Sequence, residues 1–228
     1  MGRDRDSGRH GRILVINPNS TEAVTRGIDA AMDPFRFADG PVIDCVTLSE
    51  GPPGIETQRH VDAVARPVCD MIEREDNAAD AFVIACFSDP GLLSARETTR
   101  KPVFGIGAAA YSAALLLGET FGVIAILPAS VERQRRAVRM LGLDARYAAS
   151  LPVGIVPAAL DGEAVAQRMI ETGRALIDGH GADVLIMGCA GMARYRATLE
   201  ETLGVPVIDP TQAAVAQAIA AVRIGPNS

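Results

Sequence analysis

Two short stretches of this chain decide its fold: residues 80–91, DAFVIACFSDPG, and residues 183–192, DVLIMGCAGM. In each, an aspartate precedes an apolar run that ends near a single cysteine, and small or turn-forming residues follow. Such a run, closed by a turn, is typical of a strand buried on both faces of a parallel sheet. We therefore expect Cys86 and Cys189 to lie at the ends of two buried strands.

The two stretches belong to a longer internal repeat. Asp80 and Asp183 each stand six positions before their cysteine, and Glu97 and Glu200 each stand eleven positions after it. A Pro-Val pair follows each glutamate. Two half-molecules built on one plan explain this agreement.

A weaker correspondence lies upstream of each cysteine. Pro18 is followed two positions later by Ser20, and Pro128 is followed in the same way by Ser130. A duplicated α/β unit would place the two cysteines at equivalent strand ends, facing each other across a pseudo-two-fold axis.

The rest of the chain alternates short apolar runs with longer amphipathic stretches, which predicts an α/β fold of mostly parallel sheets flanked by helices. The predicted strands are residues 12–18, 42–48, 81–87, 102–106, 121–127, 151–156, 183–189 and 206–210. Helical spacing predicts helices at residues 21–32, 55–75, 128–142, 161–179, 192–204 and 211–222. Pro67 is expected to kink or restart the second of these helices.

Composition limits the classes of function. The chain has 228 residues, of which 48% are hydrophobic and 22% are charged, so it can bury a large core. A net charge of −6 offers no basic surface for nucleic acid or an anionic membrane. No apolar run reaches the roughly 18 residues that a membrane span needs. Residues 1–11 lack the apolar core of a secretory signal. We expect them to form a disordered tail of a cytoplasmic protein whose partner is a small molecule or another subunit.

The four cysteines are too widely spaced to indicate a disulfide framework or, with three scattered histidines, a zinc site. Free cysteine is commonly a small buried hydrophobe, and we assign that role to Cys45 and Cys69. Cys86 and Cys189 differ, because ligands of parallel α/β folds bind beyond the carboxyl ends of the strands.

The surroundings of these two cysteines favour acid/base chemistry. We expect Asp89 to cap a helix beginning at Pro90, just after Cys86, and small residues follow Cys189. Backbone N–H groups near each sulfur would lower the thiol pKa from about 8.5 toward neutrality. One thiolate could then remove a proton from one face of a carbon acid while the other thiol protonates the opposite face. This chemistry is racemisation or epimerisation, and it needs no cofactor and no metal.

Two further motifs each have a structural and a functional interpretation. In INPNSTE, residues 16–22, Asn19 and Ser20 can simply begin a helix, whereas Asn17 at the strand end could bind a substrate oxygen or imide. Residues 133–139, RQRRAVR, are interpreted as a solvated helix face rather than an anion site.

Six motifs resemble the hydantoin and allantoin racemase branch of the aspartate/glutamate racemase superfamily, over about residues 12–222. They are INPNST, GPPGIE, ACFSDPGLLSARE, PVFGI, GADVLIMGCAGM and PVIDP, in this order. The resemblance implies two pseudo-symmetric lobes, residues 12–106 plus 208–228 and residues 107–207, with the active site between them.

The resemblance also implies cofactor-independent two-base racemisation with Cys86 and Cys189 as the acid/base pair, in a homo-oligomer. The substrate-binding positions that it implies are Asn17, Pro18, Phe87, Ser88, Ala190, Gly191 and Met192. The last three of these would act through their backbone amides.

The chain departs from the family pattern at several pocket positions, so the substrate stays open. Phe87-Ser88 and Ala190-Gly191 follow the cysteines, where relatives acting on free amino acids have Asn-Thr and Thr-His. A neutral ring such as a 5-substituted hydantoin therefore fits better than a zwitterion. Other departures are Ser88 for glycine, Ala108 for an acid, Ala125-Ile126 for two threonines and Pro210 for glycine. Two alternatives remain: isomerisation or decarboxylation of a related small acid, as in maleate isomerases, and non-catalytic binding of a small molecule.

Overall fold

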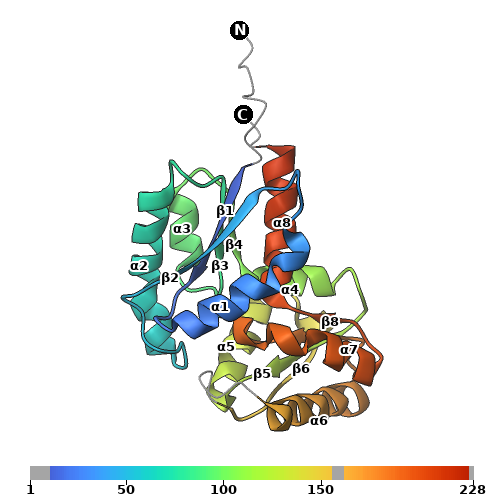
Figure 1. The fold of residues 1–228 in the computed structure, drawn as a ribbon. Coiled ribbons are helices and arrows are strands. Elements are labelled where there is room, and N and C mark those ends of the chain that lie inside the picture. Colours follow the sequence, from blue (N-terminus) through green and yellow to red (C-terminus); the bar gives the residue numbers. More distant parts are fainter. Residues whose placement is uncertain (1–10, 156–161, 226–228) are drawn as a thin grey trace.

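The structure, a computed structural model, describes residues 11–155 and 162–225. Apart from Gly11, the tail expected at residues 1–11 lies outside the described residues. In the described ranges, eight strands form two four-stranded parallel sheets (Figure 1). This confirms the predicted fold class.

The two sheets have the same strand order. The first sheet, in the order β2-β1-β3-β4, contains β1 (Arg12–Asn17), β2 (Val42–Thr47), β3 (Ala81–Ile84) and β4 (Val103–Gly105). The second, in the order β6-β5-β7-β8, contains β5 (Phe121–Ala125), β6 (Tyr147–Pro152), β7 (Val184–Met187) and β8 (Val207–Ile208). Every neighbouring pair is parallel. The internal repeat in the sequence is therefore a repeat of topology.

Helices cover both faces of each sheet (Figure 1). They are α1 (Glu22–Ala31), α2 (Gln58–Glu75), α3 (Leu92–Thr98), α4 (Ile106–Ala114), α5 (Pro128–Met140), α6 (Glu163–His180), α7 (Arg196–Leu203) and α8 (Pro210–Ile224). Short 3-10 helices span Asp33–Phe35, Asp144–Arg146 and Ala190–Tyr195. Although α8 follows the second sheet in sequence, it packs against β1, β3 and β4 of the first. We call the first sheet with α1, α2, α3 and α8 the first lobe, and the second sheet with α5, α6 and α7 the second lobe.

The central strands of the first sheet, β1 and β3, are buried on both faces, as their apolar runs predicted, whereas the edge strand β2 is partly exposed. Along β1, Ile13 and Val15 pack in a cluster with residues of α1 and α8. Leu14 and Ile16 point the other way, into a cluster with residues of α2 and α3. Alternate residues of one strand therefore fill two different cores.

One repeated aspartate has the same structural role in both lobes. Asp80 accepts the backbone N–H of Arg12, at the start of β1, at 2.8 Å. Asp183 accepts the backbone N–H of Thr120, immediately before β5, at 3.0 Å. In the weaker correspondence, the two strands β1 and β5 do occupy equivalent places, but Pro18 and Pro128 do not, because Pro18 directly follows β1 whereas Pro128 already lies in the first turn of α5.

Three local expectations need correction. The sixth strand is Tyr147–Pro152 rather than residues 151–156, because β6 is a half-buried edge strand and has no continuous apolar run. The helix α4 was not predicted, since most of its residues are buried and it lacks an amphipathic pattern. Helix α2 does not restart at Pro67 but runs through it. The last residue of the predicted sixth strand and the first of the helix predicted at residues 161–179 lie outside the described residues.

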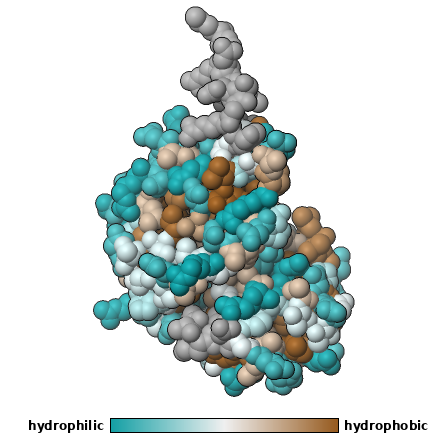
Figure 2. All heavy atoms as spheres, viewed as in Figure 1, coloured by the Kyte–Doolittle hydropathy of each residue, from teal (hydrophilic) through white to brown (hydrophobic). Residues whose placement is uncertain are grey.

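The surface in Figure 2 is mostly hydrophilic, with apolar side chains in small patches. Within the described ranges, no helix is both long and apolar enough to cross a membrane.

Candidate active site

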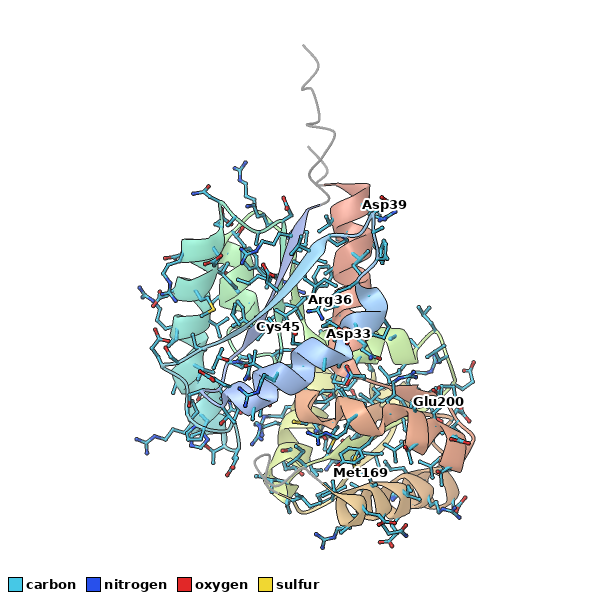
Figure 3. The ribbon with its side chains drawn as sticks, viewed as in Figure 1. Asp33, Arg36, Asp39, Cys45, Met169 and Glu200 are labelled. Carbon is cyan, nitrogen blue, oxygen red and sulfur yellow. The ribbon has the colours of Figure 1, made fainter. Side chains whose placement is uncertain are left out.

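The two central strands deliver the two cysteines to one pocket. β3 ends at Ile84 and β7 ends at Met187, and in each case a cysteine follows two residues later. Both Cys86 and Cys189 are partly exposed and line a pocket between the lobes with a cavity volume of about 60 Å³. A negative charge on Cys189 raises the pKa of Cys86, as expected for two thiols in one pocket. The remaining two cysteines do not line this pocket: Cys69 is in the first-lobe core, and Cys45 lies on β2 near Arg36 (Figure 3).

Each cysteine sulfur accepts a hydrogen bond from the backbone two residues later. The Gly191 N–H donates to the Sγ of Cys189 at 3.4 Å, where Cys189 begins the 3-10 helix Ala190–Tyr195. The Ser88 N–H donates to the sulfur of Cys86. Both amides point at the atom that would carry charge in a thiolate, so the repeat extends from topology to the chemical surroundings of the thiols.

Asp89 organises the loop after Cys86, but not as a cap of the following helix. It has a positive φ of 46°, and α3 begins only at Leu92. Its two carboxylate oxygens accept the backbone N–H groups of Gly107 and Ala108, each at 2.8 Å, at the start of α4. The predicted cap is wrong because the unpaired amides nearest to Asp89 in space belong to a helix far along the chain.

Burial makes both thiols weaker acids than free cysteine. It raises the pKa of Cys86 to about 12 and the pKa of Cys189 to about 11. The Ser88 and Gly191 amides lower these pKa values, and Arg133 also lowers that of Cys86, but burial outweighs them. The expected shift toward neutrality is therefore wrong, and both thiols rest protonated at neutral pH.

Two aspartates add negative charge near the thiols: Asp209, which is buried, and Asp89, which is partly exposed. Asp89 raises the pKa of Cys86, and Asp209 raises the pKa of Cys189. Asp209 is 2% exposed and caps α8 by accepting the Gln212 N–H at 2.8 Å. Burial in turn raises the carboxyl pKa of Asp89 to about 7 and that of Asp209 to about 6.

The substrate-binding residues implied by the family resemblance fall into two groups. Those that line the pocket are Phe87, Ser88, Ala190 and Gly191. The lining residues do not include Asn17, Pro18 or Met192. Met192 is buried in the second-lobe core, and its N–H donates to the Cys189 carbonyl at 3.2 Å.

Asn17 is connected to the pocket through Asn19. Asn17 is buried, and its side-chain amide donates to Asn19 Oδ1 at 3.1 Å and to Thr25 Oγ1 at 3.0 Å. Asn19 itself lines the pocket. The polar side chain that this motif places in the pocket is therefore Asn19, and the predicted residue Asn17 supports it through a hydrogen bond.

Sequence reasoning missed one polar wall of the pocket, formed by Ser130, Arg133 and Gln134 of α5. These residues stand at positions i, i+3 and i+4, so they share one helix face. The neighbouring Arg135 and Arg136 are exposed, as the solvated-face interpretation predicted. The signal in the sequence was helical spacing counted from Ser130, which separates the pocket-lining residues from the exposed arginines.

Among the described residues, no three His, Cys, Asp or Glu side chains gather where they could hold a metal ion. The polar groups that line the pocket with the two cysteines are backbone amides and the side chains of Asn19, Ser88 and the α5 wall. Two opposed thiols in such a pocket can exchange protons with a small carbon acid bound between them.

Three comparisons place this geometry among known proteins. The sequence model of the family described as Asp/Glu/Hydantoin racemase matches residues 13–218. The chain is 36% identical to the hydantoin racemase of Paenarthrobacter aurescens over 219 residues, which cover 94% of this chain and 92% of that protein.

Two solved structures of similar proteins share the fold. The allantoin racemase from Klebsiella pneumoniae superimposes with a TM-score of 0.88 at 34% identity, covering 94% of this chain and 89% of that chain. The allantoin racemase from Pseudomonas fluorescens gives a TM-score of 0.88 at 28% identity, covering 94% and 92%. Both cysteine loops lie within the range that the family match spans.

Proposed function

Because the chain belongs to the Asp/Glu/hydantoin racemase family, we propose that it racemises 5-substituted hydantoins or allantoin without a cofactor. Cys86 and Cys189 are the two bases of this reaction. The observation that carries the proposal is their position: one thiol from each lobe lines the same small pocket.

The active form has one of the two thiols ionised, its proton lost to solvent, and this thiolate removes the hydrogen on C5 of the ring. The electron pair of the C–H bond moves into the adjacent carbonyl and forms an enolate. The opposite thiol then donates its proton to the other face of C5, which leaves that sulfur as the thiolate. For the other enantiomer the two cysteines exchange roles, and acid/base catalysis of this kind contributes about 10²–10⁴-fold to a rate.

The loops after the two cysteines supply the groups that stabilise negative charge. The Ser88 and Gly191 amides donate to the sulfurs and oppose the effect of burial on the thiol pKa values. The Met192 amide donates to the Cys189 carbonyl, and we assign the enolate oxygen to the amide of Ala190, which lines the pocket.

Proton NMR of enantiopure rings in D₂O tests the proposal. The wild-type protein is expected to exchange the C5 hydrogen and to racemise the ring, after correction for spontaneous exchange. Cys86→Ala and Cys189→Ala should each lower racemisation by about 10²–10⁴-fold. Cys45→Ala is the matched control, because Cys45 lies outside the pocket, and it should keep full activity. Undiminished racemisation by both pocket variants would refute the mechanism.

The same assay separates the remaining alternatives. Turnover of maleate or of an arylmalonate, without exchange of any hydantoin, indicates an isomerase or decarboxylase. Saturable binding of a ring without exchange at C5 indicates a non-catalytic binding protein.

A further inference from the structure

Arg133 places a positive charge on the pocket wall without a negative partner. Its Nη1 donates to the Ala129 carbonyl at 3.0 Å and its Nη2 to the Ser130 hydroxyl at 3.2 Å, both within its own helix. Its Nε is buried and has no hydrogen-bond partner in the described part of the chain. By contrast, the nearby Arg135 pairs with Glu132, and no described carboxylate pairs with Arg133.

The groups around Arg133 do not neutralise its positive charge. Burial lowers the pKa of Arg133, and the nearby Arg136 lowers it further. The opposing contribution comes from Cys86, whose thiol rests neutral. Arginine stays protonated in proteins, so this half-buried guanidinium lacks an anion.

Gln134 provides a complementary unpaired atom beside Arg133. Its side chain is 4% exposed, and its Oε1 is buried without a hydrogen-bond partner among the described residues. It lies next to Gly188, where an added Cβ would stand 3.0 Å from Gln134 Nε2. The pocket therefore offers one unused donor, Arg133 Nε–H, and one unused acceptor, Gln134 Oε1.

A second cavity lies beside the pocket, between α2 and α5. It has a volume of about 210 Å³ and shares four lining residues with the cysteine pocket: Phe87, Ser88, Arg133 and Gln134. Arg136 also lines it. Among the described residues, no Asp or Glu lines either cavity, although acidic residues outnumber basic ones, 28 to 22, in the whole chain.

We propose that the substrate carries a carboxylate that binds Arg133, while a ring or ureido N–H donates to Gln134 Oε1. This inference rests on the proposed function and narrows it. A hydantoin ring is neutral near pH 7, so the carboxylate belongs to the 5-substituent, which extends from C5 into the second cavity. A neutral carbonyl would leave the guanidinium charge uncompensated, whereas a carboxylate pairs with it through charge-assisted hydrogen bonds.

Three matched hydantoins test the inference, with 5-substituents 2-carboxyethyl, 2-carbamoylethyl and isobutyl. The wild-type kcat/KM for the carboxylate is expected to exceed that for the amide by about tenfold or more. Arg133→Gln should lose at least about ten times more activity on the carboxylate than on the isobutyl ring. Arg133→Lys keeps the charge and should recover part of the loss. Arg135→Gln is the matched control on the same helix, 53% exposed and outside both cavities, and should behave as wild type.

Calorimetric titration of the carboxylate ring gives a readout that does not depend on turnover. The double variant Cys86→Ser/Cys189→Ser should bind this ring, and adding Arg133→Gln should weaken binding about tenfold or more. If wild type processes all three rings equally, the inference fails and the proposed function stands. If no ring exchanges its C5 hydrogen but binding still requires Arg133, the inference stands and the proposed function fails. Binding that ignores Arg133 overturns the inference in either case.

Discussion

Cys86 and Cys189 occupy equivalent places in two sheets of the same order, yet different charged groups surround them. Cys86 lies near Arg133 and Asp89, whereas Cys189 lies near Asp209. The two aspartates also do different work, since Asp89 holds the start of α4 from a distant loop and Asp209 caps its own helix. The duplicated sheet thus determines where each thiol lies, and the connecting loops determine its electrostatics.

The sharpest test of the equivalence is the stereochemistry of the single cysteine variants. With one base removed, the remaining cysteine can reach only one face of C5. Cys86→Ser is therefore expected to exchange the C5 hydrogen of one enantiomer in D₂O, and Cys189→Ser that of the other. Racemisation falls by about 10²–10⁴-fold in both.

Chiral chromatography combined with deuterium content measures this directly. Exchange of the same enantiomer by both variants would show that the two thiols do not face opposite sides of the ring.

The two cores can be compared through Phe82 and Leu185, which stand four positions before the two cysteines and are fully buried. Phe82→Ala should lower the free energy of unfolding by about 4 kcal/mol and Leu185→Ala by about 3 kcal/mol. Leu116→Ala, at a site 85% exposed, is the control and should change it by less than about 0.5 kcal/mol. Urea denaturation measures all three. A negligible loss at either core position would mean that one sheet contributes little to stability.

Asp209 predicts a pH dependence of stability that replacement by asparagine should remove. Burial raises its pKa from 3.8 to about 6, so the folded protein holds this proton more tightly than the unfolded chain does. The stabilisation is complete below about pH 4 and is lost as the pH rises through about 6. At pH 8 the charged carboxylate therefore costs about 3 kcal/mol.

Asp209→Asn keeps an oxygen for the Gln212 N–H and avoids this cost. Relative to wild type, the variant should gain stability between pH 4 and pH 8 in urea titrations. A difference that stays constant across this range would contradict the buried-charge explanation.

The smallest expected effect concerns thiol reactivity. Because burial raises the pKa of both pocket cysteines, their alkylation by iodoacetamide should rise about tenfold per pH unit from pH 7 to pH 9. Mass spectrometry of the separated peptides follows each cysteine independently. An alkylation rate that stops rising near pH 7 at either cysteine would identify a stabilised thiolate there. It would contradict the raised pKa of that residue.

The sequence predicted the fold class, the two cysteine positions and every described strand except β6, because these depend on local apolar patterns and on the repeat. It could not predict that Asp89 binds Gly107 and Ala108, since that contact depends on the packing of distant segments. The predicted direction of the thiol pKa shifts was wrong for a related reason. Proximity to amides is visible in the sequence, but the degree of burial that outweighs them is not.

Arg133 shows a different kind of limit. The arginine-rich stretch does face solvent at Arg135 and Arg136, so its interpretation as a solvated helix face holds for these residues. Two residues of this stretch, Arg133 and Gln134, nevertheless lie on the inner face of the helix and line the pocket. Composition describes a helix as a whole, whereas a binding site depends on which single positions point inward.

A racemisation has an equilibrium constant of one, because mirror-image molecules have equal free energies. For the proposed reaction, kcat/KM must then be identical for the two enantiomers, however unlike the surroundings of the two sulfurs. The unequal charges near Cys86 and Cys189 can only divide that shared value differently between affinity and turnover. For the proposed reaction, any difference between the two enantiomers would therefore appear as proportional changes in KM and kcat.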